Sequence, residues 1–161
     1  MALFNNTESQ GEENVVQPVS FQRLQSLVAR NGWNVGTPEQ VENPQFLYAY
    51  FDGVYTVFST EHDNCLMVSA FGINNLTLSL DRFEDAVMWA ADHNLGTNFG
   101  TSFISSDEDE GTVMLRVDSA IICPAGATDE QLVEWVNVAL SANLAAMKRF
   151  AEHFDVQIEQ R

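Results

Sequence analysis

The residues best suited to nucleophilic chemistry stand together in one short segment, His62-Asp63-Asn64-Cys65. The segment offers a base, a carboxylate and a thiol, and catalysis would require one of the three histidines to lie within ~3 Å of such a partner in a cleft. Cys65, however, begins an apolar run, where a thiol usually serves as a small buried hydrophobe. The other two histidines, His93 and His153, stand far away in the chain. We therefore predict no catalytic residues and a protein that is not an enzyme.

No metal or cofactor site is expected from the spacing of ligand-type residues. Zinc needs about four nitrogen or sulfur ligands in paired spacings, and Cys65 and Cys123 have no companions at such intervals. The acidic run Asp107–Glu110 could collect a hard cation, but it lacks the ligand spacing of a calcium loop and is typical of a solvated hairpin turn. Gly96 and Gly100 are isolated, so no glycine-rich phosphate loop is present.

The charge balance argues against nucleic acid and anionic lipid as partners. Among 161 residues, 23 Asp and Glu face 7 Lys and Arg, which gives a formal net charge of -16. Such a field repels phosphate groups, and DNA or RNA binding normally depends on a basic patch. No apolar run approaches the ~18 residues of a membrane-spanning helix, and the N-terminus lacks the pattern of a secretory signal. We expect a cytoplasmic protein. The acidity indicates either solubility alone or a surface that is complementary to a basic or aggregation-prone partner.

Aromatic side chains and one arginine form the candidate binding surface: Trp33, Tyr48, Tyr50, Tyr55, Trp89, Arg116 and Trp135. Trp135 precedes the core position Val136, so its ring should point partly away from the core, although flanking the core is the commoner role of such a residue. Arg116 stands in a strand of alternating apolar residues, and we expect it to pair with a carboxylate near the sheet.

The first half of the chain predicts one helix followed by a meander of three strands. Phe21, Leu24, Leu27 and Val28 recur at helical spacing before the stop signal Asn31-Gly32. Three aromatic or β-branched runs follow, at 46–51, 54–58 and 65–71, and Asp52-Gly53 between the first two is a strong hairpin signal. Their nearly continuous apolarity predicts that much of both sheet faces is covered.

The second half predicts a helix, two strands and a long helix. Asp81 followed by Glu84 resembles a capping box, and the apolar stripe expected for that helix is Phe83, Val87, Ala90 and Ala91, with an end at Asn94 to Gly96. Strands are expected near 98–105 and 112–122. Thr128 with Gln131 predicts the start of the long helix, and its core stripe is Leu132, Val136, Leu140, Met147, Phe150 and Phe154.

These elements predict an α+β fold in the order α-β-β-β-α-β-β-α, with an antiparallel sheet of about five strands flanked by helices. We expect a flexible polar and acidic tail over residues 1–17 and one domain over residues 18–158, because the tail has few residues to bury.

The segments Phe21-Gln22-Arg23-Leu24, Gly53-Val54-Tyr55, Asn94 to Gly100, Val113-Met114-Leu115-Arg116 and Thr128-Asp129-Glu130-Gln131-Leu132 carry a family resemblance. From about Ser20 to Phe154 the chain resembles the YbjN family of bacterial sensory transduction regulators. The resemblance implies a type III secretion chaperone-like fold, frequent homodimers and no established catalytic activity. It provides no family consensus of catalytic or ligand residues.

We therefore predict a non-catalytic regulatory or chaperone-like module that binds a protein partner through an apolar patch and forms a homodimer. The alternative is a sensor domain that binds a small ligand between the sheet and the long helix. In that case Tyr48, Tyr50, Tyr55 and Arg116 would be its polar contacts, and a closed pocket of about 300 Å³ would be needed.

Overall fold

The computed structural model describes residues 15–38, 41, 42, 44–61 and 64–158. Residues 1–14 of the predicted tail, and His62 and Asp63 of the possible nucleophilic segment, lie outside the described residues. Gln17, which we assigned to the tail, forms an antiparallel bridge with Ala127. No described helix has the length and apolarity needed to cross a membrane.

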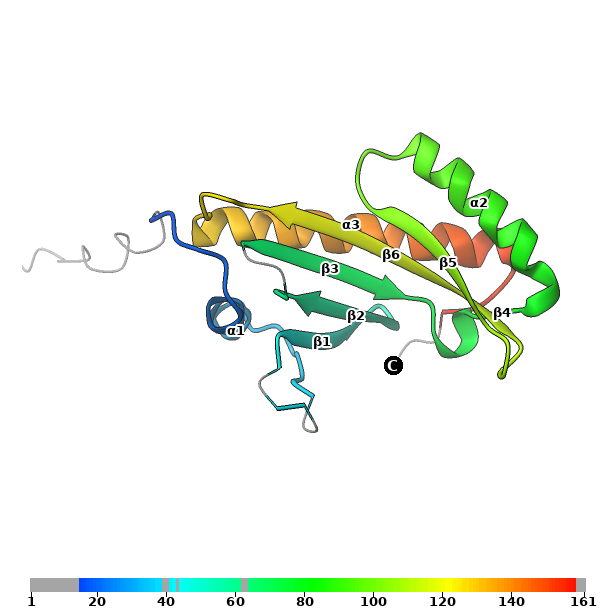
Figure 1. The fold of residues 1–161 in the computed structure, drawn as a ribbon, viewed down its shortest axis with the longest axis horizontal. Coiled ribbons are helices and arrows are strands. Elements are labelled where there is room, and N and C mark those ends of the chain that lie inside the picture. Colours follow the sequence, from blue (N-terminus) through cyan, green and yellow to red (C-terminus); the bar gives the residue numbers. More distant parts are fainter. Residues whose placement is uncertain (1–14, 39–40, 43, 62–63, 159–161) are drawn as a thin grey trace, which may run out of the picture.

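The fold is a six-stranded antiparallel sheet with α3 packed along one face (Figure 1). The strand order is β1-β2-β3-β6-β4, and β5 pairs with the other edge of β6. The helices and strands are α1 Phe21–Arg30, β1 Phe46–Phe51, β2 Val54–Ser59, β3 Cys65–Phe71, β4 Leu78–Ser79, α2 Phe83–Gly96, β5 Thr101–Asp107, β6 Thr112–Ile122 and α3 Asp129–Phe154. Two 3-10 helices, η1 Asn74–Leu76 and η2 Leu80–Arg82, flank β4. The predicted α+β class and element order are confirmed, and β4 is the additional strand.

The β1–β2 hairpin forms where the sequence predicts it. Asp52 and Gly53 both have positive φ, 48° and 81°. Two consecutive residues in this conformation give the turn whose twist matches that of antiparallel strands. The resulting register sets Tyr50 opposite Tyr55.

The long helix α3 begins at the predicted cap and carries the predicted stripe. The Thr128 side chain accepts from the Gln131 backbone N–H while the Gln131 side chain accepts from the Thr128 N–H, which completes a capping box. Its 26 residues span about 39 Å. All six predicted stripe residues are buried. Helix α3 therefore contributes buried side chains along the whole length of the core.

Two clusters of buried side chains lie under the same face of the sheet. The first joins α1, the first three strands and the N-terminal half of α3. The second joins α2, β4, β6 and the C-terminal half of α3. Between them, the fully buried Asn143 donates to the carbonyl oxygens of Val68 (2.8 Å) and Val117 (3.2 Å) and accepts from the Ser119 hydroxyl (2.8 Å). The side-chain amide of Asn143 thus links α3 to β3 and β6 by hydrogen bonds.

The start of α2 differs from the sequence-based prediction. Asp81 lies in η2 and accepts from the Ser79 hydroxyl, and α2 begins at Phe83 with Arg82 as the N-cap, whose side chain makes no capping hydrogen bond. The apolar stripe is also rotated, because Ala86 and Ala90 are buried while Phe83 and Val87 are exposed. Because alanine side chains are small, they allow α2 to approach the core closely. This close packing explains why the side of α2 with Ala86 and Ala90 is buried.

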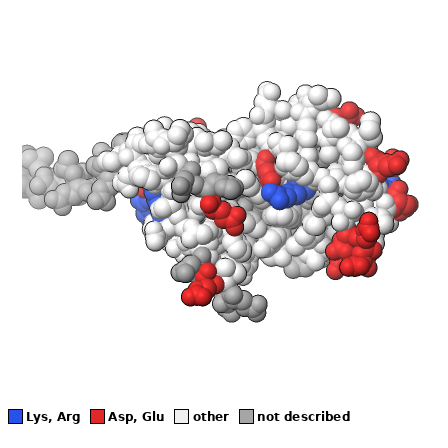
Figure 2. Space-filling view, in the orientation of Figure 1, with Lys and Arg blue, Asp and Glu red and all other residues white. Residues whose placement is uncertain are grey.

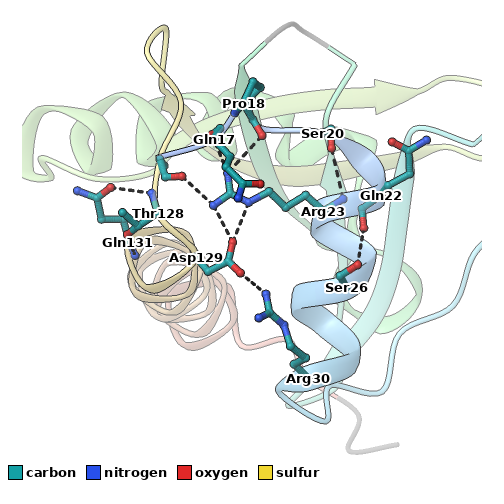
Figure 3. A network of polar contacts seen from close by, with 11 residues as sticks. Gln17, Pro18, Ser20, Gln22, Arg23, Ser26, Arg30, Thr128, Asp129 and Gln131 are labelled. Atoms are coloured by element: carbon teal, nitrogen blue, oxygen red, sulfur yellow. Dashed lines mark hydrogen bonds and ion pairs between the residues drawn. The ribbon is translucent and has the colours of Figure 1, made fainter. Parts of the chain in front are cut away.

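A polar network ties α1 to the start of α3 (Figure 3). Arg23 donates from Nε to Asp129 Oδ1 at 2.7 Å, and its other nitrogens donate to the carbonyl oxygens of Ala127 and Gln17, both at 2.7 Å. Arg30 binds the second oxygen of Asp129. Burial alone would raise the pKa of Asp129, but the hydrogen bonds from Arg30 and Arg23 outweigh it and hold the pKa below its usual value.

Candidate functional site

Within the described part of the chain, no helix packs on one face of the sheet. Side chains alternate between faces along each strand, and those directed toward α3, such as Leu47, Phe58 and Leu115, are buried. The helical residues of both core clusters pack on that side of the sheet. On the opposite face, which we call the open face, Tyr50 is 41% and Phe103 49% exposed. The prediction that much of both sheet faces is covered does not hold at Tyr50 and Phe103 of this face, among the described residues.

A row of five side chains crosses the open face from β1 to β5. The registers pair Tyr50 with Tyr55, Tyr55 with Phe71, Phe71 with Arg116, and Arg116 with Phe103. Ring centroids are 5.4 Å apart for Tyr50 and Tyr55 and 6.0 Å apart for Tyr55 and Phe71. Distances of this size are typical of favourable aromatic contacts. We call these five residues the cross-strand row.

Arg116 lies between Phe71 and Phe103 in the cross-strand row. Its guanidinium carbon lies 5.7 Å from the ring centroid of Phe71 and 5.9 Å from that of Phe103, within the range of cation–π contacts. Its Nε donates to Asp118 Oδ1 at 2.8 Å, and a second nitrogen donates to the other carboxylate oxygen. The predicted pairing of Arg116 with a carboxylate at the sheet is confirmed.

The open face carries little unbalanced charge. Among its strand residues, Arg116 and Asp118 bind each other, and Asp107 stands at the end of β5. Burial, with smaller contributions from Tyr50 and Tyr48, raises the pKa of Tyr55, so its hydroxyl stays neutral at physiological pH. In Figure 2 this face is mostly uncharged, and carboxylates gather at the end of the molecule where β5 meets β6. An apolar surface with an acidic rim is the result.

The acidic run at that end is a hairpin turn, as predicted. The Asp107 carboxylate accepts from the backbone N–H groups of Asp109 and Glu110, both at 3.0 Å. Within the described part of the chain, no group of three His, Cys, Asp or Glu side chains is placed to hold a metal ion.

The structure brings together four of the seven candidate binding residues. Tyr48, Tyr50, Tyr55 and Arg116 lie on the open face, and the rings of Tyr48 and Tyr55 are 5.9 Å apart. They cannot line a pocket between the sheet and α3, because the backbone of the sheet separates them from that helix. The proposed sensor pocket at this position is therefore not supported.

The three tryptophans lie elsewhere, on the helical side. Trp33 packs on the first core cluster and stacks on Phe58 with centroids 6.4 Å apart. Trp135 is half-buried against the same cluster, as expected for a residue that flanks the core. The rings of Trp89 and Phe150 are nearly perpendicular, with centroids 5.1 Å apart.

Sequence reasoning missed Phe71 and Phe103 as members of the surface. Both were assigned to predicted strands, but their neighbours across the sheet depend on the strand register. The signal was present in part, because the Asp52-Gly53 hairpin fixes the register of Tyr50 against Tyr55. No short sequence motif indicates the register in which β3 and β5 pair with β6.

A surface hollow lies between α2 and α3. A groove of about 680 Å³ is lined by residues that include Trp89, His93, Arg149 and His153. The two histidines, far apart in sequence, therefore line the same groove. Burial, followed by the nearby charge of Arg149, lowers the pKa of His93 despite an opposing side-chain hydrogen bond with Asn94. This imidazole is neutral at physiological pH.

Among the residues that the structure describes, the polar partners of His93 and Cys65 do not form an accessible nucleophilic site. His93 Nδ1 lies 3.1 Å from the hydroxyl of Ser102, but Ser102 is only 4% exposed, so a substrate cannot reach that oxygen. Burial raises the pKa of the Cys65 thiol despite an opposing backbone hydrogen bond, which disfavours the reactive thiolate. The contact of His93 with Ser102 instead holds α2 against β5.

Comparison with known proteins gives a family and a similar structure. The sequence model of the YbjN family, described as "Putative bacterial sensory transduction regulator", matches residues 20–155. No curated protein matches the chain in sequence. Among solved structures, "Crystal structure of YbjN, a putative transcription regulator from E. coli" aligns with a TM-score of 0.68 at 16% identity. The alignment covers 88% of this chain and 98% of that one, so the two proteins share a fold.

Proposed function

Because the chain belongs to the YbjN family, we propose that it is a non-catalytic regulatory protein that acts by binding a segment of another protein on its open face. The cross-strand row is the observation that carries this proposal. Aromatic residues and arginine are enriched where proteins bind one another. The row places both kinds of residue on an exposed surface.

The dimensions and charge of the open face indicate what kind of segment fits. The row crosses five strands and so spans about 19 Å, since neighbouring strands are about 4.8 Å apart. A helix of about 13 residues has this length. The acidic rim favours a segment whose apolar side chains are flanked by lysine or arginine. We propose such a segment as the occupant.

A chaperone-like action is consistent with the charge of the chain. A bound apolar segment would be shielded from other apolar surfaces, and the net charge of -16 would keep the complex soluble by repulsion between copies. We place this activity in the cytoplasm, where a regulatory partner would be available.

The term "transcription regulator" in the description of the E. coli structure raises the possibility of contact with DNA. We propose that this chain does not bind DNA directly. Arg23, Arg30, Arg82 and Arg116 are ion-paired within the molecule, and the formal charge is strongly negative. Any effect on transcription would pass through a protein partner.

Photo-cross-linking in living cells tests the proposal. Phe103→benzoylphenylalanine places a photoreactive group at the exposed end of the row. Leu95→benzoylphenylalanine is the matched control, because Leu95 is 88% exposed on α2 and lies outside the row. We expect irradiation to link the first variant to one other protein through a segment of the stated kind, and the control not to do so.

Each other outcome argues against the proposal. Absence of any adduct at position 103, or the same adducts at both positions, would show that the open face is not a specific site. An adduct only to a second copy of the chain would make the face a dimer interface instead. The predicted homodimer stays a prediction, and the mass of the unmodified protein in solution checks it separately.

A further inference from the structure

The groove between α2 and α3 has the size of a small-molecule site. Its volume of about 680 Å³ falls inside the range of about 300 to 1,000 Å³ that is usual for ligand pockets. Its lining comes from two helices and from η2, and it lies on the helical side of the sheet, away from the cross-strand row. Its occupant therefore need not be the protein that the open face binds.

Part of the groove wall is a stacked pair of rings that is fixed in position. The rings of Trp89 and His93 stack with centroids 5.0 Å apart and an interplanar angle of 11°. The Trp89 ring packs against Phe150, which is fully buried. The His93 ring is fixed by its contact with the Ser102 hydroxyl. A wall that does not have to reorganise favours a planar apolar group, since little entropy is lost on binding.

Arg149 supplies a positive charge that the rest of the protein leaves unused. The other four described arginines each bind a carboxylate. Arg149 has no ion-pair partner among the residues that the structure describes, although the chain contains 23 carboxylate side chains and only 7 cations. An arginine at a groove, without a carboxylate of its own, is suited to an oxyanion from outside, because its donors match carboxylate and phosphate geometry.

We propose that the groove between α2 and α3 binds a small organic anion, a carboxylate or a phosphate monoester attached to a planar ring. Arg149 binds the oxyanion, and the ring lies against Trp89 and His93. His153, one helical turn from Arg149 on the same side of α3, also lines the groove and adds an imidazole that can donate a hydrogen bond.

Two carboxylates limit the charge of the ligand. Asp85 is 3.0 Å from Arg82 and neutralises it, and Asp92 also lines the groove. Arg82 and Arg149 are thus matched in number by Asp85 and Asp92, and the groove has no excess positive charge from these four residues. It suits a ligand with few negative charges and disfavours a nucleoside triphosphate, whose charge the groove cannot balance.

Titration of the full-length protein with benzoate and with phenyl phosphate, followed by NMR, tests this proposal. The signal of the Trp89 indole N–H, assigned with a Trp89→Phe variant, reports on the groove. We expect a saturable shift with at least one of the two anions, and the preferred anion identifies the headgroup. Benzyl alcohol, which has a similar ring and no charge, should bind at least about tenfold more weakly.

Arg149→Gln and Lys148→Gln form a matched pair of variants. Both remove one positive charge at neighbouring exposed positions, but only Arg149 lines the groove. We expect Arg149→Gln to weaken binding at least about tenfold and Lys148→Gln to change it less than about twofold. The proposal is overturned if neither anion gives a saturable shift at about 10 mM. Equal binding of benzyl alcohol, or unchanged affinity in Arg149→Gln, would also overturn it.

Discussion

Arg23 and Asp129, 106 positions apart in the chain, are joined by a hydrogen bond of 2.7 Å between Nε and Oδ1. The contact connects α1 with the first turn of α3, and it links two of the segments that carry the family resemblance. The Arg23 side chain is only 10% exposed. Its carbonyl contacts at residues 17 and 127 depend on the same geometry, so Asp129 fixes the whole N-terminal connection.

Replacing Asp129 should destabilise the protein. In Asp129→Asn the two guanidinium groups of Arg23 and Arg30 lose their negative partner, and we expect a loss of about 2 kcal/mol in the free energy of unfolding. Urea unfolding followed by circular dichroism measures it. Glu134→Gln, an exposed position one turn further along α3, is the control and should lose less than about 0.5 kcal/mol. Equal losses would show that the network is not important for stability.

The same network makes stability depend on pH in the acidic range. The folded state lowers the pKa of Asp129, so the unfolded chain takes up the proton first as the pH falls. The contribution of Asp129 is complete above about pH 4 and is lost as the pH falls through the lowered folded value. The difference in unfolding free energy between the wild type and Asp129→Asn should therefore shrink between pH 6 and pH 3. A difference that stays constant would contradict the assigned ion pairs.

Asn143 should be among the most sensitive positions of the core. Asn143→Leu removes the donor for the carbonyl oxygens of Val68 and Val117 and leaves the Ser119 hydroxyl without its acceptor. Buried polar groups without partners are costly, and we expect a loss of about 3 kcal/mol. Asn137→Leu, on the exposed side of the same helix, should change stability by less than about 0.5 kcal/mol. Thermal or urea unfolding of both variants measures these two changes in stability.

Arg116 should matter more for binding than for folding. Its side chain is 44% exposed, and exposed ion pairs contribute about 0 to 1 kcal/mol. Arg116→Leu should therefore unfold at nearly the same urea concentration as the wild type. A loss of more than about 2 kcal/mol would assign Arg116 a structural role instead.

Local signals predicted the elements whose geometry is decided within a few residues. The Asp52-Gly53 turn, the Thr128 and Gln131 capping box and the bounds of β3 and β6 follow from short-range chemistry. The stripe of α3 was also predictable, since six apolar residues on one side of a helix must find a core.

Features decided by tertiary packing could not be predicted in this way. Helix α2 has two apolar arcs, and the sequence does not reveal that the arc of Ala86 and Ala90 faces the core. Strands that are apolar on both sides do not indicate which face remains open. The groove depends on an α2 residue such as His93 meeting Arg149 of α3, which no local spacing records.

The central position of β6 has a consequence for synthesis on the ribosome. This strand hydrogen-bonds to β3, β4 and β5, and all three partners are translated before it. Until residues 112–154 emerge, the meander has neither its central neighbour nor the helix that covers its core. Sheets built from distant segments fold slowly, and their partly formed states aggregate easily. The nascent chain thus presents uncovered strands from the appearance of β1 until residues 112–154 have emerged.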